Sequence, residues 1–193
     1  IPIVPTRQRH ATAEATRAYA GQHAGRLGAS AYRTLGRTGW SVSAIGFGGY
    51  RVDDTHSPYR DALTHALTHG VNLIDTSSNY TDGGSERLMG GVLKNGAGIP
   101  EREAVIVVSK VGYVQGQNME VAKAAIAEGH PFPDMVEYHP QCWHCLHPLF
   151  LEDQLERSLK RLEMDALDVY LLHNPEYFFA FMVYSCPRGL PRP

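Results

Sequence analysis

The chain has 193 residues, of which 43% are hydrophobic and 20% charged, with 18 basic and 20 acidic side chains. This length fits one globular domain, and the composition excludes disordered, collagen-like and coiled-coil chains. A net charge of -2 argues against binding to a nucleic-acid backbone. The longest apolar run, near 177–184, is far shorter than the roughly 20 residues that cross a bilayer. We therefore expect neither a nucleic acid nor a membrane as a partner.

The cysteine content and the amino-terminal segment bear on the cellular location. The chain has three cysteines, Cys142, Cys145 and Cys186. They are too few for a disulfide-framed secreted domain, so we predict a cytoplasmic protein. Residues 1–31 are expected to form a flexible extension, in which arginines outnumber acids. That excess of arginine resembles an organellar targeting segment, so this alternative stays open. Because the chain begins at Ile1 and not at Met, we expect its natural start to lie upstream.

The ordered part opens with a glycine-bracketed turn in YRTLGRTGWSVS, which predicts a small hairpin. It leads into a first buried strand at 44–47. Apolar residues at helical spacing then predict a helix from about 58 to 69. Ser57 is expected to be its N-cap, and Gly70 is expected to end it.

Strands and helices alternate along the rest of the chain. Strands are predicted at 71–75, 104–110 and 167–173, and helices at 85–96 and 151–165. The run AVIVVSK lacks polar alternation, which is typical of a strand buried on both faces of a parallel sheet. Residues 111–150 show no strong periodicity beyond a short helix candidate, MEVAKAAIAEG, and we expect an insertion that packs over one end of the sheet. The alternation predicts a parallel sheet with helices on its outside.

Three ionisable residues fall at the carboxyl ends of predicted strands. Asp75 closes VNLI, Lys110 closes VIVVS and His173 closes VYLL. In barrels of parallel strands, chemistry is assembled at this end. Tyr80 lies five residues after Asp75 on the same loop, which adds a phenol to the group.

These four side chains suit proton transfer to a carbonyl oxygen. The phenol of Tyr80 would be the acid, because the ammonium of Lys110 favours the phenolate that remains. Asp75 would pair with Lys110 and fix its position. His173, held neutral, would hydrogen-bond the carbonyl oxygen of the substrate and orient it.

Four segments resemble the aldo-keto reductases: YRTLGRTGWSVSAIGFGG, IDTSSNYTDGGSERLMGGVL, VIVVSK and DALDVYLLH. The resemblance covers roughly residues 32 to 179 and implies an α/β fold of the TIM-barrel type, (β/α)8, with an N-terminal β-hairpin. It places Asp75, Tyr80, Lys110 and His173 on the catalytic tetrad of that family. Tyr80 would be the general acid in carbonyl reduction and the base in the reverse oxidation of an alcohol.

The resemblance also implies the cofactor. The hydride would come from NADPH, with NADH as the alternative, and Gly48, Gly49, Tyr50 and Asp75 would lie beside the nicotinamide. The absence of a G-x-G-x-x-G fingerprint agrees with a barrel and argues against a Rossmann fold. An aldehyde, a ketone or a sugar would be the substrate, and aromatic candidates for its pocket are Tyr50, Tyr113 and Trp143.

The chain departs from the family pattern in its length. Only about four strand–helix units can be counted, whereas the closed barrel requires eight and typically about 250 residues. We therefore expect a truncated half-barrel followed by a divergent tail over 180–193, and self-association through its exposed strand edges. The alternative to an active reductase is an inactive half-barrel that serves only as a binding fragment or reflects an incomplete gene model.

A cluster of histidines and cysteines in the predicted insertion suggests a second reading, a zinc site: His139, Cys142, His144, Cys145 and His147. A structural zinc site usually takes its second pair of ligands from a distant segment, whereas all five candidates lie within nine residues. We therefore predict no metal here and favour a loop packed over the mouth of the barrel.

Overall fold

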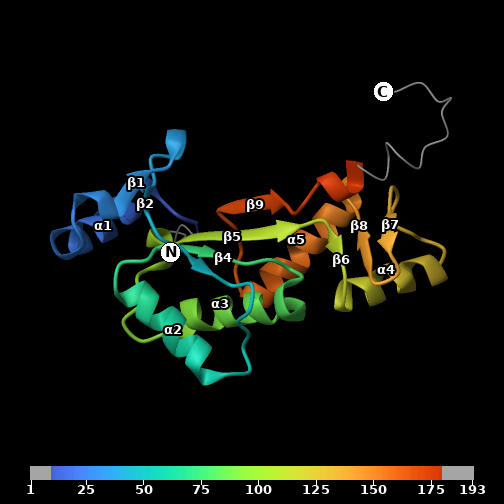
Figure 1. The fold of residues 1–193 in the computed structure, drawn as a ribbon, viewed down its shortest axis with the longest axis horizontal. Coiled ribbons are helices and arrows are strands. Elements are labelled where there is room, and N and C mark those ends of the chain that lie inside the picture. Colours follow the sequence, from blue (N-terminus) through green and yellow to red (C-terminus); the bar gives the residue numbers. More distant parts are fainter. Residues whose placement is uncertain (1–9, 180–193) are drawn as a thin grey trace, which may run out of the picture.

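The structure is a computed structural model and describes residues 10–179 (Figure 1). At its centre is a parallel sheet with the strand order β3-β4-β5-β9. The strands are β3 (Phe47–Gly48), β4 (Leu73–Asp75), β5 (Ile106–Val111) and β9 (Val169–Leu172). The predicted parallel sheet is thereby confirmed, although β3 is shorter than the strand expected at 44–47. Cys186 and the tail 180–193 lie outside the described residues.

Three helices lie on one side of this sheet (Figure 1). They are α2 (Ser57–Thr68), α3 (Gly84–Asn95) and α5 (Pro148–Leu162). Their buried leucines Leu63, Leu88 and Leu162 share one core cluster with Ile74 and Val107 of the sheet. The helical periodicity seen in the sequence is therefore the stripe that packs on the sheet.

The predicted N-cap of α2 is wrong. The helix begins at Ser57, and His56 occupies the N-cap position without a side-chain hydrogen bond. Ser57 already lies in the first turn, so its hydroxyl cannot cap the turn from outside. The predicted stop is close, because the helix ends at Thr68, and Gly70 follows with a φ of 113°, which favours glycine.

The central strand β5 is buried on both faces, as its sequence predicts. Val107 packs in the cluster under the helices, while Ile106 and Val108 pack in a second cluster with Ala11 and Val42. The lack of polar alternation therefore reflects two apolar environments, one on each side of the sheet.

The amino-terminal part differs from the flexible extension expected over 1–31. Residues Ala13–Leu27 form helix α1, which Thr12 caps through its side chain, and Tyr19 and Thr16 are buried. The hydroxyl of Tyr19 donates to the backbone oxygen of Leu67, which anchors α1 to the end of α2. The sequence did not predict this contact, because α1 has only a weak apolar stripe. The contact depends on the ring of Tyr19 and on polar groups.

The predicted hairpin is confirmed. Strands β1 (Tyr32–Thr34) and β2 (Ser41–Ser43) pair antiparallel, and Gly39 makes the turn with a φ of 71°. Short 3-10 turns complete the described chain: η1 (Ala29–Ala31), η2 (Gly36–Thr38), η3 (Tyr80–Gly83) and η4 (Arg102–Ala104).

The segment 111–150 has more regular structure than the sequence pattern indicated. It holds β6 (Tyr113–Val114), helix α4 (Gln117–Ala127), β7 (Val136–His139) and β8 (Cys142–His144). The three strands form an antiparallel sheet in the order β6-β8-β7. Figure 1 shows these three strands together with α4, a unit that we call the insertion sheet, beyond the carboxyl end of β5.

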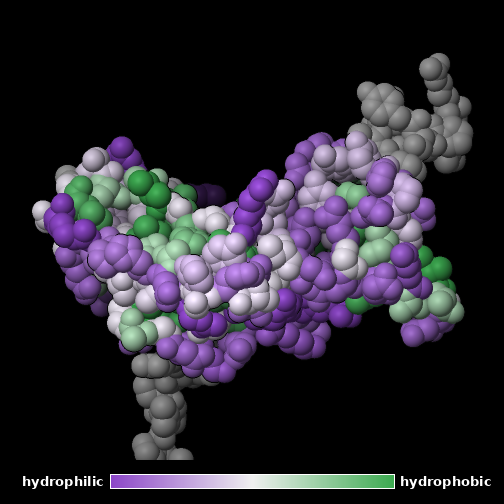
Figure 2. Space-filling view, turned by 60° about the horizontal axis from the view of Figure 1, so that its bottom comes forward, coloured by the Kyte–Doolittle hydropathy of each residue, from purple (hydrophilic) through white to green (hydrophobic). Residues whose placement is uncertain are grey.

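The outer surface of the helical layer is largely hydrophilic (Figure 2). Hydrophobic residues gather at the end of the molecule that carries α1 and the hairpin, on the left of that view. Leu27, Leu35 and Ile45 of this amino-terminal part are exposed. Within residues 10–179 no helix has the length and apolar character needed to cross a membrane.

A close approach between α3 and α5 gives a test of this packing. A Cβ at Gly90 would lie 2.3 Å from the backbone oxygen of Leu162, whereas a Cβ at the neighbouring Gly91 would meet only the tip of Arg60, at 3.6 Å. Gly90→Ala should lower the free energy of unfolding by about 1–3 kcal/mol through overpacking. Gly91→Ala should raise it by up to about 1 kcal/mol through helix propensity. Urea denaturation of both variants checks the pair, and equal effects would contradict the packing.

Candidate active site

The ammonium of Lys110 joins the predicted site residues at the carboxyl ends of β4 and β5. Its Nζ donates to Asp75 Oδ2 at 2.7 Å, to the backbone oxygen of Thr76 at 2.9 Å and to the hydroxyl of Tyr80 at 3.2 Å. These three acceptors use all three N–H bonds of the ammonium. The Lys110 side chain is only 12% exposed, so the charge needs these partners.

The sheet register explains why these residues meet. Asp75 pairs with Gly48 of β3 on one side and with Val108 of β5 on the other. Lys110 pairs with Leu171 of β9. Neighbouring parallel strands therefore end at one edge, and their last side chains converge there, as the sequence predicted.

Tyr80 reaches this edge from the loop after β4. The next two residues, Thr81 and Asp82, have φ values of 47° and 54°, in the left-handed region. The loop is tied to the start of α4, because the backbone N–H of Gln117 donates to Asp82 Oδ1 at 2.9 Å and its side-chain amide donates to the Asp82 backbone oxygen at 2.6 Å. Asn79 donates to Gln115 at 3.1 Å. The start of α4 therefore holds the loop that carries the phenol.

His173 completes the group from the end of β9. Its Nδ1 lies 3.0 Å from Ser77 Oγ, and its ring lies edge-on to those of Tyr80 and Tyr113, at 5.6 and 4.8 Å between centroids. Burial, followed by the nearby charge of Lys110, lowers the pKa of His173 to about 4. The imidazole is therefore neutral near pH 7, as the proposed orienting role requires.

The glycines predicted to lie near the cofactor adjoin this group. The backbone N–H of Gly49 donates to the backbone oxygen of Asp75 at 2.7 Å, and a Cβ at Gly49 would lie 2.2 Å from Ser85 Oγ. Gly49 is therefore needed for the local packing. A Cβ at Gly48 would meet no atom within 4 Å, so its surface is open to a ligand. Tyr50 is 63% exposed, with its ring 5.2 Å from that of Tyr80.

A cleft of about 500 Å³ lies in front of Tyr80 and His173. Its walls combine tyrosines and side-chain amides with two histidines and one cysteine: Tyr50, Asn79, Tyr80, Tyr113, Gln115, Tyr138, His139, Cys142, His173, Asn174 and Tyr177. Trp143 was expected in this pocket, but it is buried in the core behind the insertion sheet. On a strand, the side chain next to a pocket residue points to the opposite face, which accounts for this difference.

Several residues of the site carry little or no signal in the sequence. Ser77 lies two residues after Asp75 in the motif segment, and this closeness is the only signal in the sequence that points to it. Tyr138 and Tyr177 reach the cleft from the insertion sheet and from the turn after β9, and no local pattern marks them.

The histidines and cysteines of the insertion sheet have separate surroundings. No group of three or more His, Cys, Asp or Glu side chains within residues 10–179 could hold a metal ion. Cys142 lines the cleft, while Cys145 is fully buried and donates to the backbone oxygen of Pro133 at 3.4 Å. Burial raises the pKa of both thiols, that of Cys145 to about 11, which opposes the thiolate form that zinc binds.

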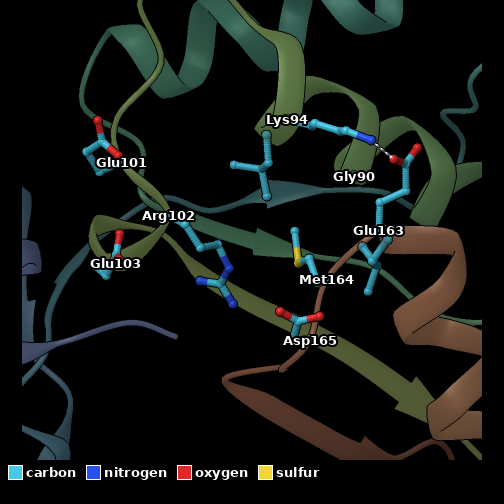
Figure 3. A pocket seen from close by; sticks show the side chains of 10 residues that line it. Gly90, Lys94, Glu101, Arg102, Glu103, Glu163, Met164 and Asp165 are labelled. Atoms are coloured by element: carbon cyan, nitrogen blue, oxygen red, sulfur yellow. Dashed lines mark hydrogen bonds and ion pairs between the residues drawn. The ribbon is translucent and has the colours of Figure 1, made fainter. Parts of the chain in front are cut away.

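A second cavity, of about 410 Å³, lies near the starts of β5 and β9 (Figure 3). Lys94 and Glu163 form an ion pair across it, and Arg102 lies within it. Arg102 donates to the backbone oxygen of Val105 at 2.7 Å and to Asp168 at 2.8 Å, so it ties η4 to the start of β9. This cavity lies at the opposite end of the strands from Lys110, and Arg102 there has a structural role.

The neutral state of His173 can be measured. NMR titration should give a pKa near 4 instead of the ordinary 6.5. Between these two values the unfolded chain binds a proton that the folded chain does not, so this residue should lower the stability as the pH falls through that window. Lys110→Met should raise the pKa of His173, because the neighbouring charge is lost, whereas Lys94→Met should leave it unchanged. A pKa near 6.5 in the unmodified chain would contradict the buried environment.

Known proteins match this chain in sequence and in fold. A sequence model of the Aldo/keto reductase family matches residues 44–182. The NADH-specific methylglyoxal reductase of Escherichia coli is 32% identical over 141 residues, which cover 72% of this chain and 38% of the relative. Aldo-keto reductase AMT2 of Alternaria alternata is 30% identical over 157 residues, which cover 75% of this chain and 41% of that protein.

The fold comparison agrees. Aldo-keto reductase AKR11C1 from Bacillus halodurans superposes with a TM-score of 0.56 at 24% identity, over 79% of this chain and 46% of that structure. The chain thus spans about two fifths of the length of the two sequence relatives described above. Its parallel strands, with helices outside and a hairpin before them, form part of a TIM-barrel fold. On the family match and the fold together, this chain belongs to the aldo/keto reductase family.

Proposed function

We propose that the site reduces the carbonyl group of an aldehyde, ketone or sugar, or oxidises the corresponding alcohol, with Tyr80 as the general acid or base. The observation that carries the proposal is the linked set of contacts from Asp75 through Lys110 to the Tyr80 hydroxyl, at 2.7 and 3.2 Å. Residues 32–179 would form the catalytic unit.

Each member of the proposed tetrad has its own task. Tyr80 gives its proton to the carbonyl oxygen, and the ammonium of Lys110 stabilises the phenolate that is left. Asp75 compensates the charge of Lys110 and keeps the ammonium beside the phenol. His173 is neutral, and Ser77 Oγ lies beside its Nδ1, which leaves Nε2 for the substrate oxygen. This role takes the tautomer with the hydrogen on Nε2, in which Nδ1 accepts from the Ser77 hydroxyl.

A nicotinamide cofactor would supply the hydride. Gly48, Gly49, Tyr50 and Asp75 would hold its nicotinamide end, since the open surface at Gly48 adjoins Tyr50 and Asp75. The family resemblance favours NADPH. NADH is the alternative, because the E. coli relative is named as NADH-specific. A cytoplasmic location is part of the proposal, supported by the free thiols of Cys142 and Cys145.

The test combines turnover with cofactor binding. Tyr80→Phe should lower the rate of methylglyoxal reduction by about 10²- to 10⁴-fold, the usual contribution of a general acid. It should leave binding of NADPH, followed by its fluorescence, unchanged. Tyr59→Phe, the same substitution on α2, is the control and should affect neither. Retained turnover in Tyr80→Phe would remove Tyr80 from the acid role.

A second candidate function is self-association, with the chain as a binding module. β3 and β9 are the end strands of the parallel sheet, and Leu171 and Leu172 of β9 are 44% and 49% exposed. Unpaired strand edges with apolar side chains favour pairing with another chain.

Analytical ultracentrifugation tests this second candidate. The chain should show a concentration-dependent dimer, and replacing Leu171 and Leu172 together by Lys should shift it to the monomer. Ile126→Lys on α4, where the side chain is 48% exposed, is the control and should leave the dimer intact. A monomer at every concentration would refute self-association without touching the proposed chemistry.

A further inference from the structure

His144 of β8 is a buried imidazole that the proposed reaction does not use. It is fully buried, and its Nε2 lies 2.8 Å from the backbone oxygen of His173. Because a backbone oxygen only accepts, Nε2 carries the hydrogen and donates. This hydrogen bond joins the insertion sheet to His173, the residue that follows β9.

Gly112 leaves the space in which this bond forms. Its φ is 136°, and a Cβ there would lie 2.6 Å from Nε2 of His144 and 3.2 Å from the backbone oxygen of His173. Any other side chain would push the two apart. The backbone oxygen of Gly112 also accepts from the backbone N–H of Cys145 at 2.9 Å, which holds the end of β8 beside Gly112.

Both polar groups of the His173 backbone, the N–H and the oxygen, make hydrogen bonds. Its N–H donates to the backbone oxygen of Val111 at 2.7 Å, and its oxygen accepts from His144. The last parallel pair of β5 and β9 is Val111 with Leu172, so His173 lies just beyond the regular ladder. There the contact with His144 fixes the peptide from which the imidazole of His173 projects.

The surroundings of His144 favour a specific role over simple packing. Its Nδ1 is buried and has no hydrogen-bond partner among the described residues. A buried nitrogen without a partner costs stability, which an apolar side chain of similar size would avoid. Burial lowers the pKa of His144, so the ring stays neutral and donates through Nε2 alone. Tyr113 lies edge-on to both His144 and His173, at 5.5 and 4.8 Å between ring centroids.

We propose that His144 is a positioning residue: its Nε2–H holds the His173 peptide and thereby sets the place of the His173 imidazole beside Tyr80. The inference rests on the proposed role of His173 in orienting the carbonyl substrate. It gives the insertion sheet a task in the reaction, although His144 itself touches neither the substrate nor the hydroxyl of Tyr80.

The experiment compares four variants of the full 193-residue chain. His144→Phe removes the donor, and His144→Gln keeps a side-chain N–H that reaches a similar distance. Val136→Ala weakens the packing of β7 at the residue paired with His144 and keeps the imidazole. His130→Phe repeats the first substitution at an exposed histidine of the same segment.

In kinetic assays with methylglyoxal and NADPH, His144→Phe should lower kcat by about tenfold to a hundredfold, the effect of a misplacement near 1 Å, with KM for NADPH unchanged. His144→Gln should restore most of the lost rate. Val136→Ala should melt at a lower temperature and keep the original kcat. The loss of rate would then follow the donor and not the stability.

NMR of the His173 ring decides the inference without any turnover. The ring signals and the pKa of His173 should change in His144→Phe and stay as in the unmodified chain in His144→Gln and His130→Phe. Unchanged signals in His144→Phe, or an equal change in Val136→Ala, would overturn the positioning role. If the unmodified chain shows no turnover, the proposed function fails on its own, while these spectra still decide whether His144 positions His173.

Discussion

The arrangement of the site depends on the hydrogen bonds that the ammonium of Lys110 donates. This ammonium lies near the end of the central strand and donates to a side chain, a backbone oxygen and a phenol that come from β4 and the loop after it. A charge that is nearly buried is stable only with such partners. The register of β4 against β5 sets Asp75 beside Lys110, and Tyr80 reaches the same nitrogen from the loop after β4.

A second buried network supports the strand next to this charge. Ser109 donates to Glu86 at 2.6 Å, and Arg161 donates to the other oxygen of Glu86 at 2.6 Å. Glu86 is fully buried on α3, and Arg161 belongs to α5. The network thus locks both helices to β5 one residue before Lys110. Removing one partner of such a pair costs about 3–5 kcal/mol, because the remaining charge stays buried.

The insertion sheet has a larger part in the site than a covering loop would have. The start of α4 holds the loop of Tyr80 through Gln115 and Gln117, and β8 reaches the end of β9 through His144. Two of the four proposed tetrad residues are thus supported by the same segment. The parallel strands bring the side chains together, and the insertion sheet restricts the backbone on either side of the cleft.

The sequence by itself determined the parallel sheet and the place of the polar strand ends, because an apolar run without alternation and an ionisable residue at its close are local patterns. It also determined the family resemblance, which named Asp75, Tyr80, Lys110 and His173. Only the tertiary structure decided that α1 packs against β2 and η4, that the insertion forms three antiparallel strands, and that Trp143 faces the core. The bond from His144 to His173 spans 29 residues, and neither residue's neighbours encode it. Such contacts depend on how separate elements pack, and packing leaves no periodic signal in the chain.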